Sequence, residues 1–227
     1  MKRSRYDKVP SVPVPGGFEL RKGWEAVGHR LKTQLSEHGR AVLVVDTYPG
    51  VNDAELLGEL EARLKPALII RTVELKKPEP ELLRSFERNL TDDRIFGFMS
   101  GHELAEFFAA DRLASARSLV ENTRRGLVLV YGVGADLVAR GDLLVYADMA
   151  RWELQLRYRR GLGNWGAGNG GEDFFRKYKR SFFVEWCAAD RHKFGLFERF
   201  DFFLDTHIAG SPKMIEGRAV REALRHT

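Results

Sequence analysis

The sequence contains a single cysteine, Cys187, among 227 residues. One cysteine excludes an internal disulfide and a cysteine-rich zinc site, and this usage fits a reducing, cytoplasmic compartment. Its surroundings, FFVEWCAAD, predict a buried and inert thiol. The sequence also lacks a run of about 18 apolar residues, so no membrane-spanning helix is expected. Residues 1–8 are basic but have no apolar segment behind them, which argues against a secretory signal.

Motifs for metal binding and for common hydrolases are also lacking. None of the six histidines lies in an HxH, HExxH or QxH pattern, so no metal site is predicted. A GxSxG nucleophile elbow is absent as well. The residues therefore point to no resident cofactor.

Positive charge is present but uneven. The net charge is +5, and residues 157–193 alone hold nine Lys/Arg against four Asp/Glu, a local excess of five. Basic surfaces attract nucleic acids, phosphorylated metabolites or acidic partners. A small surplus confined to one segment favours a phosphate pocket and argues against a nucleic-acid face.

Apolar runs alternate with amphipathic stretches along the chain. The runs predict strands at 41–45, 67–73, 127–131, 143–147 and 201–206. The amphipathic stretches predict helices at 23–37, from Asn52 onward, from Pro78 onward, between Ser100 and Val120, at 151–160 and at 212–225. This alternation predicts a three-layer α/β fold with a mostly parallel sheet flanked by helices. We expect an extended N-terminal arm at 1–20 and a single domain at 21–227.

The first strand runs into DTYPGVN (46–52), which has the shape of a phosphate loop. A working GxxxxGK[ST] loop needs converging backbone amides, a lysine and a Ser/Thr for magnesium. This loop has one glycine, Gly50, no lysine, and a proline that removes an amide. Two interpretations stay open: a tight strand–helix turn, or a ligand site that uses Asp46 and Tyr48.

Two further strand ends carry candidate residues. Gly132 and Gly134 follow one strand in VYGVGAD, where they allow close approach of a ligand or of another element. Asp148 ends the next strand and is either a metal or hydroxyl ligand or a helix cap. In the following helix, Arg151 and Arg159 share a face.

A basic lid is predicted at about 157–193. It contains Arg157, a glycine-rich stretch at 161–171 that reads as a flexible surface loop, and the segment KYKRSFFVEWCAADRHK (177–193). Lysine and arginine are standard phosphate donors, so we expect Lys179, Arg180 and Arg191 to bind phosphate, or else to form a solvated basic face. The aromatic residues of the segment are expected in the core.

Several of these motifs resemble a known family. They are YDKVPSV, DTYPGV, LTDDRIFGFM, VYGVGADLV, YADMARWELQLRYR, KYKRSFFVEW, ADRHK and PKMIEG. Together they resemble the N-terminal region of long bacterial class I mannose-6-phosphate isomerases, over about residues 6–217. That region is similar to uridine kinases and related nucleotide kinases of the P-loop type. The positions that match the kinase pattern are Asp148, Arg157, Arg159, Lys179 and Arg180.

The resemblance implies a role in carbohydrate metabolism, but the isomerase chemistry belongs to a cupin domain with His, Gln and Glu zinc ligands, and this chain has no such cluster. The resemblance therefore implies a kinase-like, nucleotide-independent domain that binds a phosphorylated sugar or nucleotide, with a cupin isomerase domain as a possible partner. Asp46, Tyr48 and Asp148 would contact hydroxyls, and Arg151 with the other basic residues would hold phosphate.

Two alternatives remain. The first is an active nucleoside or sugar kinase with an altered loop, in which Asp46 or Asp148 is the general base and Mg–ATP is the cofactor. The second is a non-catalytic docking domain for a cupin isomerase. Its footprint would be an exposed apolar surface on the last helix, formed by Met214, Ile215, Val220 and Leu224.

Overall fold

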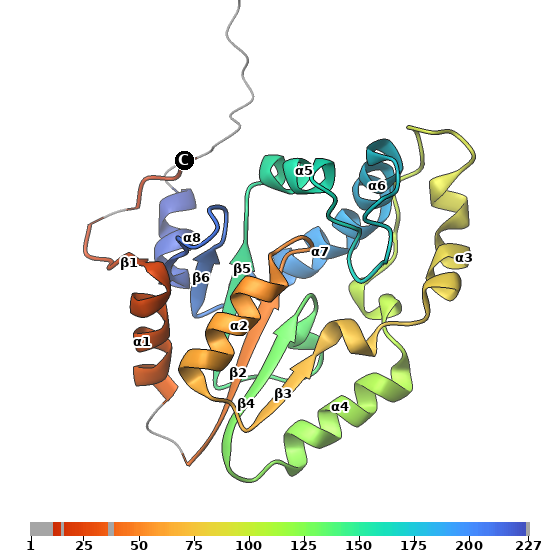
Figure 1. Ribbon diagram of the computed structural model, residues 1–227. Coiled ribbons are helices and arrows are strands. Elements are labelled where there is room, and N and C mark those ends of the chain that lie inside the picture. Colours follow the sequence, from red (N-terminus) through yellow and green to blue (C-terminus); the bar gives the residue numbers. More distant parts are fainter. Residues whose placement is uncertain (1–10, 15, 36–38, 226–227) are drawn as a thin grey trace, which may run out of the picture.

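One seven-stranded sheet organises the computed structural model, which describes residues 11–14, 16–35 and 39–225 (Figure 1). Its strands are β1 (Arg21–Lys22), β2 (Arg40–Thr47), β3 (Leu68–Arg71), β4 (Gly126–Gly132), β5 (Leu143–Asp148), β6 (Phe202–Asp205) and β7 (Lys213–Glu216). They lie in the order β1-β7-β6-β5-β2-β4-β3. The neighbouring pairs from β6 to β3 are parallel, whereas β7 runs antiparallel to both β6 and β1. The predicted α/β fold with a mostly parallel sheet is confirmed.

Helices connect the strands. The α-helices are α1 (Gly23–Leu35), α2 (Asp53–Leu64), α3 (Glu79–Leu90), α4 (Ala110–Asn122), α5 (Arg151–Arg159), α6 (Phe174–Arg180), α7 (Trp186–Leu196) and α8 (Gly217–Arg225). Short 3-10 helices occur at η1 (Thr72–Leu75), η2 (Leu104–Phe107) and η3 (Ala135–Leu137). A π-helical turn, η4 (Ser181–Glu185), joins α6 to α7.

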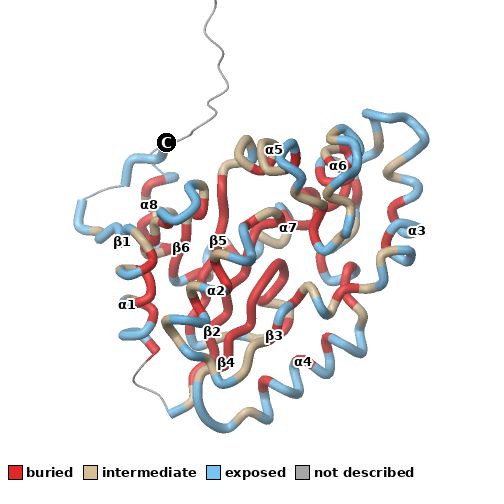
Figure 2. The backbone as a smooth tube through the Cα atoms, viewed as in Figure 1, coloured by how far each residue is buried: buried red, intermediate tan, exposed pale blue. Residues whose placement is uncertain are grey.

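Both faces of the central sheet are covered. On β2, Leu43 and Val45 belong to a core cluster with residues of α1 and α2. The alternating positions Val42 and Val44 belong to a second cluster with residues of α4 and α7. Burial on both faces explains why this strand reads as a continuous apolar run. Figure 2 shows the resulting band of buried residues through the strands, with exposed residues on the outer turns of α3 and α4.

The C-terminal prediction needs a correction. The expected helix at 212–225 begins only at Gly217, because residues 213–216 form β7. Met214 and Ile215 are buried in this strand, and of the expected apolar footprint only Leu224 is strongly exposed, at 44%. Antiparallel pairing with β6 and β1 provides hydrogen-bond partners for the backbone groups of this segment. The segment therefore forms a strand although its apolar residues also fit a helical pattern.

The expected helix between Ser100 and Val120 is also wrong as a single element. It divides into η2 and α4, and Phe108 between them forms an isolated bridge with Lys76. The backbone amide of Ala109 then donates to the carbonyl of Leu75 at 3.0 Å. Tertiary pairing to the segment after β3 therefore interrupts the helical pattern.

The helix start predicted at Asn52 is confirmed. Helix α2 begins at Asp53, and the Asn52 side chain makes no capping hydrogen bond to the backbone. A reciprocal capping box occurs instead at η2, between Glu103 and Glu106.

The glycine-rich stretch is held by interior contacts. The Lys177 ammonium donates to the carbonyl oxygens of Tyr158, Leu162 and Gly170 at 2.9, 3.0 and 2.7 Å. Asn164 and Trp165 within the stretch are buried, so the expectation of an exposed surface loop is wrong for these two residues. From Phe174 to Leu196 the predicted lid is a continuous helical segment whose Trp186 is part of the core.

Of the predicted N-terminal arm, residues 11–14 and 16–20 form no helix or strand, and residues 1–10 and 15 lie outside the described part. None of the helices in the described ranges is both long enough and apolar enough to cross a membrane.

Candidate functional site

Three parallel strands, β4, β2 and β5, end side by side at one edge of the sheet. Asp46 near the end of β2 pairs in register with Gly132 on β4 and with Tyr146 on β5. After β2 the chain passes through α2 to β3 on one side, whereas after β5 it passes through α5 to α7 and reaches β6 on the other side (Figure 1). Connections that leave neighbouring strands in opposite directions open a crevice at the carboxyl ends, where open α/β sheets bind ligands.

A group of charged and hydroxyl side chains converges at this edge, and we call it the strand-end cluster. Its members are Asp46, Tyr48, Asp148, Arg151, Asp190, His192 and Lys193. They come from the ends of β2 and β5, the start of α5 and the middle of α7.

Asp46 is the buried anchor of the cluster. One carboxylate oxygen accepts the backbone amide of Gly134 at 3.2 Å, and the other accepts that of Asp136 at 2.9 Å. The second oxygen also lies 2.8 Å from Nε2 of His192. The carboxylate therefore fixes the turn after β4 and orients an imidazole of α7.

The protonation of His192 follows from this pairing. Burial lowers the pKa of His192, but the neighbouring carboxylate of Asp46, with a smaller contribution from Asp136, raises the pKa by more. The net effect is a pKa above the ordinary value of 6.5. Arg199 opposes this effect, and it is itself paired with Asp136 at 2.6 Å. The Asp46–His192 pair thus favours the charged imidazolium near neutral pH.

Asp148 forms the second pair of the cluster. One of its oxygens accepts the amide of Met149 at 2.8 Å, and the other forms an ion pair with the Lys193 ammonium. That ammonium also lies 5.9 Å from the ring centroid of Tyr48 and 5.7 Å from that of Tyr146. Asp148 is therefore not the cap of α5, and a lysine of α7 reaches the strand ends.

Tyr48, Arg151 and Asp190 form the outer part of the cluster. The Tyr48 hydroxyl donates to Asp190 at 2.9 Å and accepts from Arg151 at 2.7 Å. Arg151 contacts both oxygens of Asp190, at 3.0 and 2.9 Å, and its guanidinium lies 4.7 Å from the ring centroid of Trp186. Burial, followed by Asp190, raises the pKa of Tyr48 far above its ordinary value, so this hydroxyl stays protonated.

Helix α7 supplies Asp190 and His192, which the sequence did not single out, and Lys193, which belongs to the basic segment predicted to bind phosphate. The helix buries Trp186 and Ala188 against the sheet, which holds the following turn over the strand ends. The sequence contained one signal for these residues. Two acids predicted to end buried strands require basic residues nearby, so a basic segment had to pack against the strand ends. ADRHK, directly after an apolar stretch, offers such residues.

The cluster is closed on the inside and open on the outside. The Asp46 side chain is 1% exposed, whereas those of Arg151, Asp190 and Lys193 are 40%, 50% and 34% exposed. A solute can therefore reach the guanidinium and the ammonium, with a fixed acid–base pair behind them.

The loop 46–52 is a tight turn. The amide of Tyr48 donates to the carbonyl of Ala147 at 2.8 Å, so it is not free to bind phosphate. Gly50 has φ of 97°, and an added Cβ would overlap the side chain of Leu154. Its carbonyl accepts from Arg157 at 2.9 Å. Gly50 is therefore required for packing against α5.

The local structure also explains why residues 132 and 134 are glycines. Gly132 has φ of 118°, and an added Cβ would overlap the hydroxyl of Thr72. Gly134 has φ of 76° and donates its amide to Asp46. The pair of glycines thus shapes the turn that Asp46 holds.

Arg157 and Arg159 lie outside the cluster. Arg157 donates to the carbonyls of Gly50 and, at 3.2 Å, of Thr206, which fastens α5 to two loops. Arg159 lies 4.0 Å from the ring centroid of Phe174.

The remaining predicted phosphate residues also have internal partners. Arg191 donates to the carbonyl of Ser100 at 3.1 Å. Lys179 donates to the carbonyl of Thr91 at 3.2 Å, and Arg180 forms ion pairs with two glutamates. Of the basic residues predicted to hold phosphate, Arg151 is the one that the structure places in the strand-end cluster, where it pairs with Asp190 of α7.

No group of three or more His, Cys, Asp or Glu side chains suited to a metal ion occurs within residues 11–14, 16–35 and 39–225. A family model for a domain of unknown function, DUF8485, matches residues 23–227, a range that includes the whole strand-end cluster. No curated protein matches the chain. The resemblance to mannose-6-phosphate isomerases and uridine kinases therefore stays a prediction from sequence motifs.

Proposed function

Because the chain belongs to the DUF8485 family, whose function is unknown, its role has to be argued from the site, and we propose that it binds a phosphorylated sugar or nucleotide at the strand-end cluster. The domain is kinase-like in architecture and does not depend on an ordinary Mg–nucleotide loop. As the motif resemblance implies, its protein partner is a cupin isomerase domain of sugar-phosphate metabolism.

One observation carries this proposal: Arg151 and Lys193 present solvent-open cationic groups at the carboxyl ends of parallel strands. Asp190 and Asp148 hold these groups in place. A phosphate brings more acceptor oxygens than one carboxylate and can take bidentate hydrogen bonds from a guanidinium. The cations are preorganised, so little side-chain entropy is lost on binding.

Behind the cations, the cluster offers contacts for hydroxyl groups. His192 uses Nε2 for Asp46, and Nδ1 has no hydrogen-bond partner among the described residues. The Tyr48 hydroxyl lies beside Arg151. A sugar hydroxyl next to the bound phosphate would find both an imidazole nitrogen and a phenol within the same site.

A second candidate function is phosphoryl transfer, and Lys193 is the observation that favours it. The loop 46–52 lacks a lysine, but α7 brings the Lys193 ammonium to Asp148 at the end of β5. Phosphoryl transfer depends on positioning and charge neutralisation, which a lysine from another element could supply. In this case Asp148 or Asp46 would be the base, and ATP with magnesium would be needed.

A thermal-shift screen tests the two candidates. The panel is mannose 6-phosphate, fructose 6-phosphate, uridine, UTP, ATP and inorganic phosphate, each with and without magnesium. A ligand at about 100 times its dissociation constant adds roughly 2.7 kcal/mol of stability, which is easily measured. We expect a shift with a phosphorylated compound in the absence of magnesium.

Arg151→Gln and Lys193→Gln should each reduce that shift, because each removes a charged hydrogen bond of about 1.5–3 kcal/mol. Arg125→Gln is the matched control: Arg125 is exposed and precedes β4 at the opposite edge of the sheet. A response only to Mg–ATP, accompanied by ATP turnover that Asp148→Asn abolishes, would favour the kinase. No response to any compound would contradict both candidates.

A further inference from the structure

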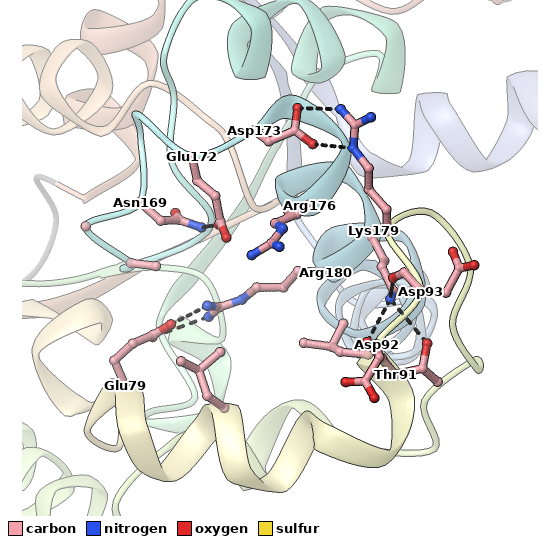
Figure 3. Close-up of a pocket in the computed structure, with 15 residues that line it drawn as sticks. Glu79, Thr91, Asp92, Asp93, Asn169, Glu172, Asp173, Arg176, Lys179 and Arg180 are labelled. Carbon is pink, nitrogen blue, oxygen red and sulfur yellow. Dashed lines mark hydrogen bonds and ion pairs between the residues drawn. The ribbon is translucent and has the colours of Figure 1, made fainter.

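A polar hollow lies away from the strand-end cluster, between α3, the turn after it, the glycine-rich stretch and α6 (Figure 3). Its volume is about 1070 Å³, and it shares no lining residue with the cluster. A hollow of this size accommodates a drug-sized molecule.

The basic wall of the hollow is fixed in position. Arg180 is buried and pairs with Glu79 at the rim and with Glu185 behind it, the latter at 2.8 Å. Lys179 is also buried, and it donates to the carbonyls of Thr91 and Asp93. These side chains form a rigid wall, because moving them would leave buried charges without partners.

Arg176 differs from its neighbours. Its side chain forms no hydrogen bond or ion pair with the described residues, and in Figure 3 its guanidinium points into the space between Glu172 and Arg180. A guanidinium that points into such a space, with no carboxylate bound to it among the described residues, is suited to receive an anionic group.

The hollow also offers acceptors and apolar surface. Asp92 forms no side-chain hydrogen bond or ion pair in the described part of the chain, and Glu172 accepts only the amide of Asn169, at 2.8 Å. Leu83 and Leu90 line the same space. Free carboxylate oxygens suit sugar hydroxyls, and leucine side chains suit the C–H face of a sugar ring.

We propose that this hollow is a second ligand site, and that it binds a sugar carrying one anionic group, with the anion on Arg176 and the hydroxyls on Asp92 and Glu172. A nucleotide fits less well, because no aromatic side chain lines the hollow to stack on a base. The anion is a phosphate or a carboxylate, which have the same hydrogen-bond chemistry towards a guanidinium.

Nuclear magnetic resonance of ¹⁵N-labelled protein tests this site. The titrants are glucose 6-phosphate, glucuronate, uncharged glucose and inorganic phosphate. We expect at least one of the two anionic sugars to shift the amide signals of residues 91–94 and 167–169, and uncharged glucose to leave them in place. The sugar that binds identifies the anion as phosphate or carboxylate.

Arg176→Gln should weaken this binding by about tenfold or more, since one charged hydrogen bond accounts for at least one decade of affinity. Arg84→Gln is the control, because Arg84 is an exposed arginine of α3 that donates only to its own helix. Arg151→Gln separates the two sites: it should leave these shifts unchanged even if the strand-end proposal fails. Binding that is unaffected by Arg176→Gln, equal binding of uncharged glucose, or no shifts with either anionic sugar would overturn the proposal.

Discussion

The strand-end acids Asp46 and Asp148 pair with adjacent residues of α7, His192 and Lys193. A third basic residue of the cluster, Arg151, opens α5 and is held by Asp190 from the same turn of α7. The chemistry at the strand ends therefore depends on the placement of one helical turn.

Asp46→Asn should destabilise the protein by about 3 kcal/mol. The substitution breaks a buried pair with His192. Each carboxylate oxygen of Asp46 also accepts one backbone amide, and asparagine keeps only one oxygen. Urea unfolding at pH 6.5 measures the loss. Asp205→Asn is the control, because Asp205 ends β6 and its side chain accepts, within the described ranges, only the backbone amide of His207. A loss for Asp46→Asn no larger than that of the control would contradict the anchoring role of Asp46.

The stability contributed by His192 should depend on pH. Because the folded state raises the pKa of this imidazole above 6.5, the contribution is complete below pH 6.5 and is lost as pH rises through the folded pKa. The difference in unfolding free energy between wild type and His192→Gln should therefore shrink from pH 6 to pH 9. Urea unfolding across that range measures it, and a difference that grows with pH would show that the sign is wrong.

At the residue scale, the sequence predicted acids more successfully than bases. Asp46 and Asp148 are recognisable because each ends an apolar run, and a strand's end is a local property. The partner of an acid is set by which helix lies over the strand ends, and that is a long-range property. Arg157 and Arg191 have the right charge but donate to internal carbonyls.

At the scale of elements, the turn from β2 to α2 shows how a phosphate-loop shape arises without its chemistry. Its glycine provides clearance for Leu154 of α5, and the Tyr48 amide is already bonded to Ala147.

Gly50→Ala should destabilise the protein by about 2–4 kcal/mol, because it combines a positive φ with overlap on Leu154. Gly58→Ala is a matched control in the interior of α2, where an added Cβ meets nothing within 4 Å. It should stabilise by about 0.5–1 kcal/mol. Thermal unfolding of both variants measures the contrast, and equal effects would refute the packing role of Gly50.

The glycine-rich stretch should resist proteolysis as long as Lys177 is present. Lys177→Met removes hydrogen bonds to two carbonyls of the stretch, those of Leu162 and Gly170, and to that of Tyr158 in α5, and it should speed cleavage within 161–171. Limited proteolysis with a broad-specificity protease measures the rate. Arg176→Gln is the control, since Arg176 holds none of these carbonyls. Wild type cut as quickly as Lys177→Met would show that the clamp has no effect.

The central elements were predictable because buried parallel strands are continuous apolar runs, as at 41–45 and 127–131. Strand β7 was not predictable, because Met214 and Ile215 also fit an amphipathic helix, and pairing with β6 and β1 selects the strand. The break at Phe108 likewise depends on a distant partner, Lys76.

At the scale of the molecule, the diverging connections from β2 and β5 place the cluster where a ligand is expected, and α7 fills part of that crevice. Because the hollow beside α3 is separate from the cluster, the two proposed anion sites can be tested independently.

Isothermal titration calorimetry measures phosphate binding at the strand-end cluster. The titrant is the phosphorylated compound with the largest thermal shift, without magnesium, and the protein carries Arg176→Gln so that the hollow does not contribute. We expect one binding event, unchanged by Arg125→Gln and weakened about tenfold or more by Arg151→Gln. Equal affinity with and without the Arg151 guanidinium would contradict the claim that the strand-end cluster binds phosphate.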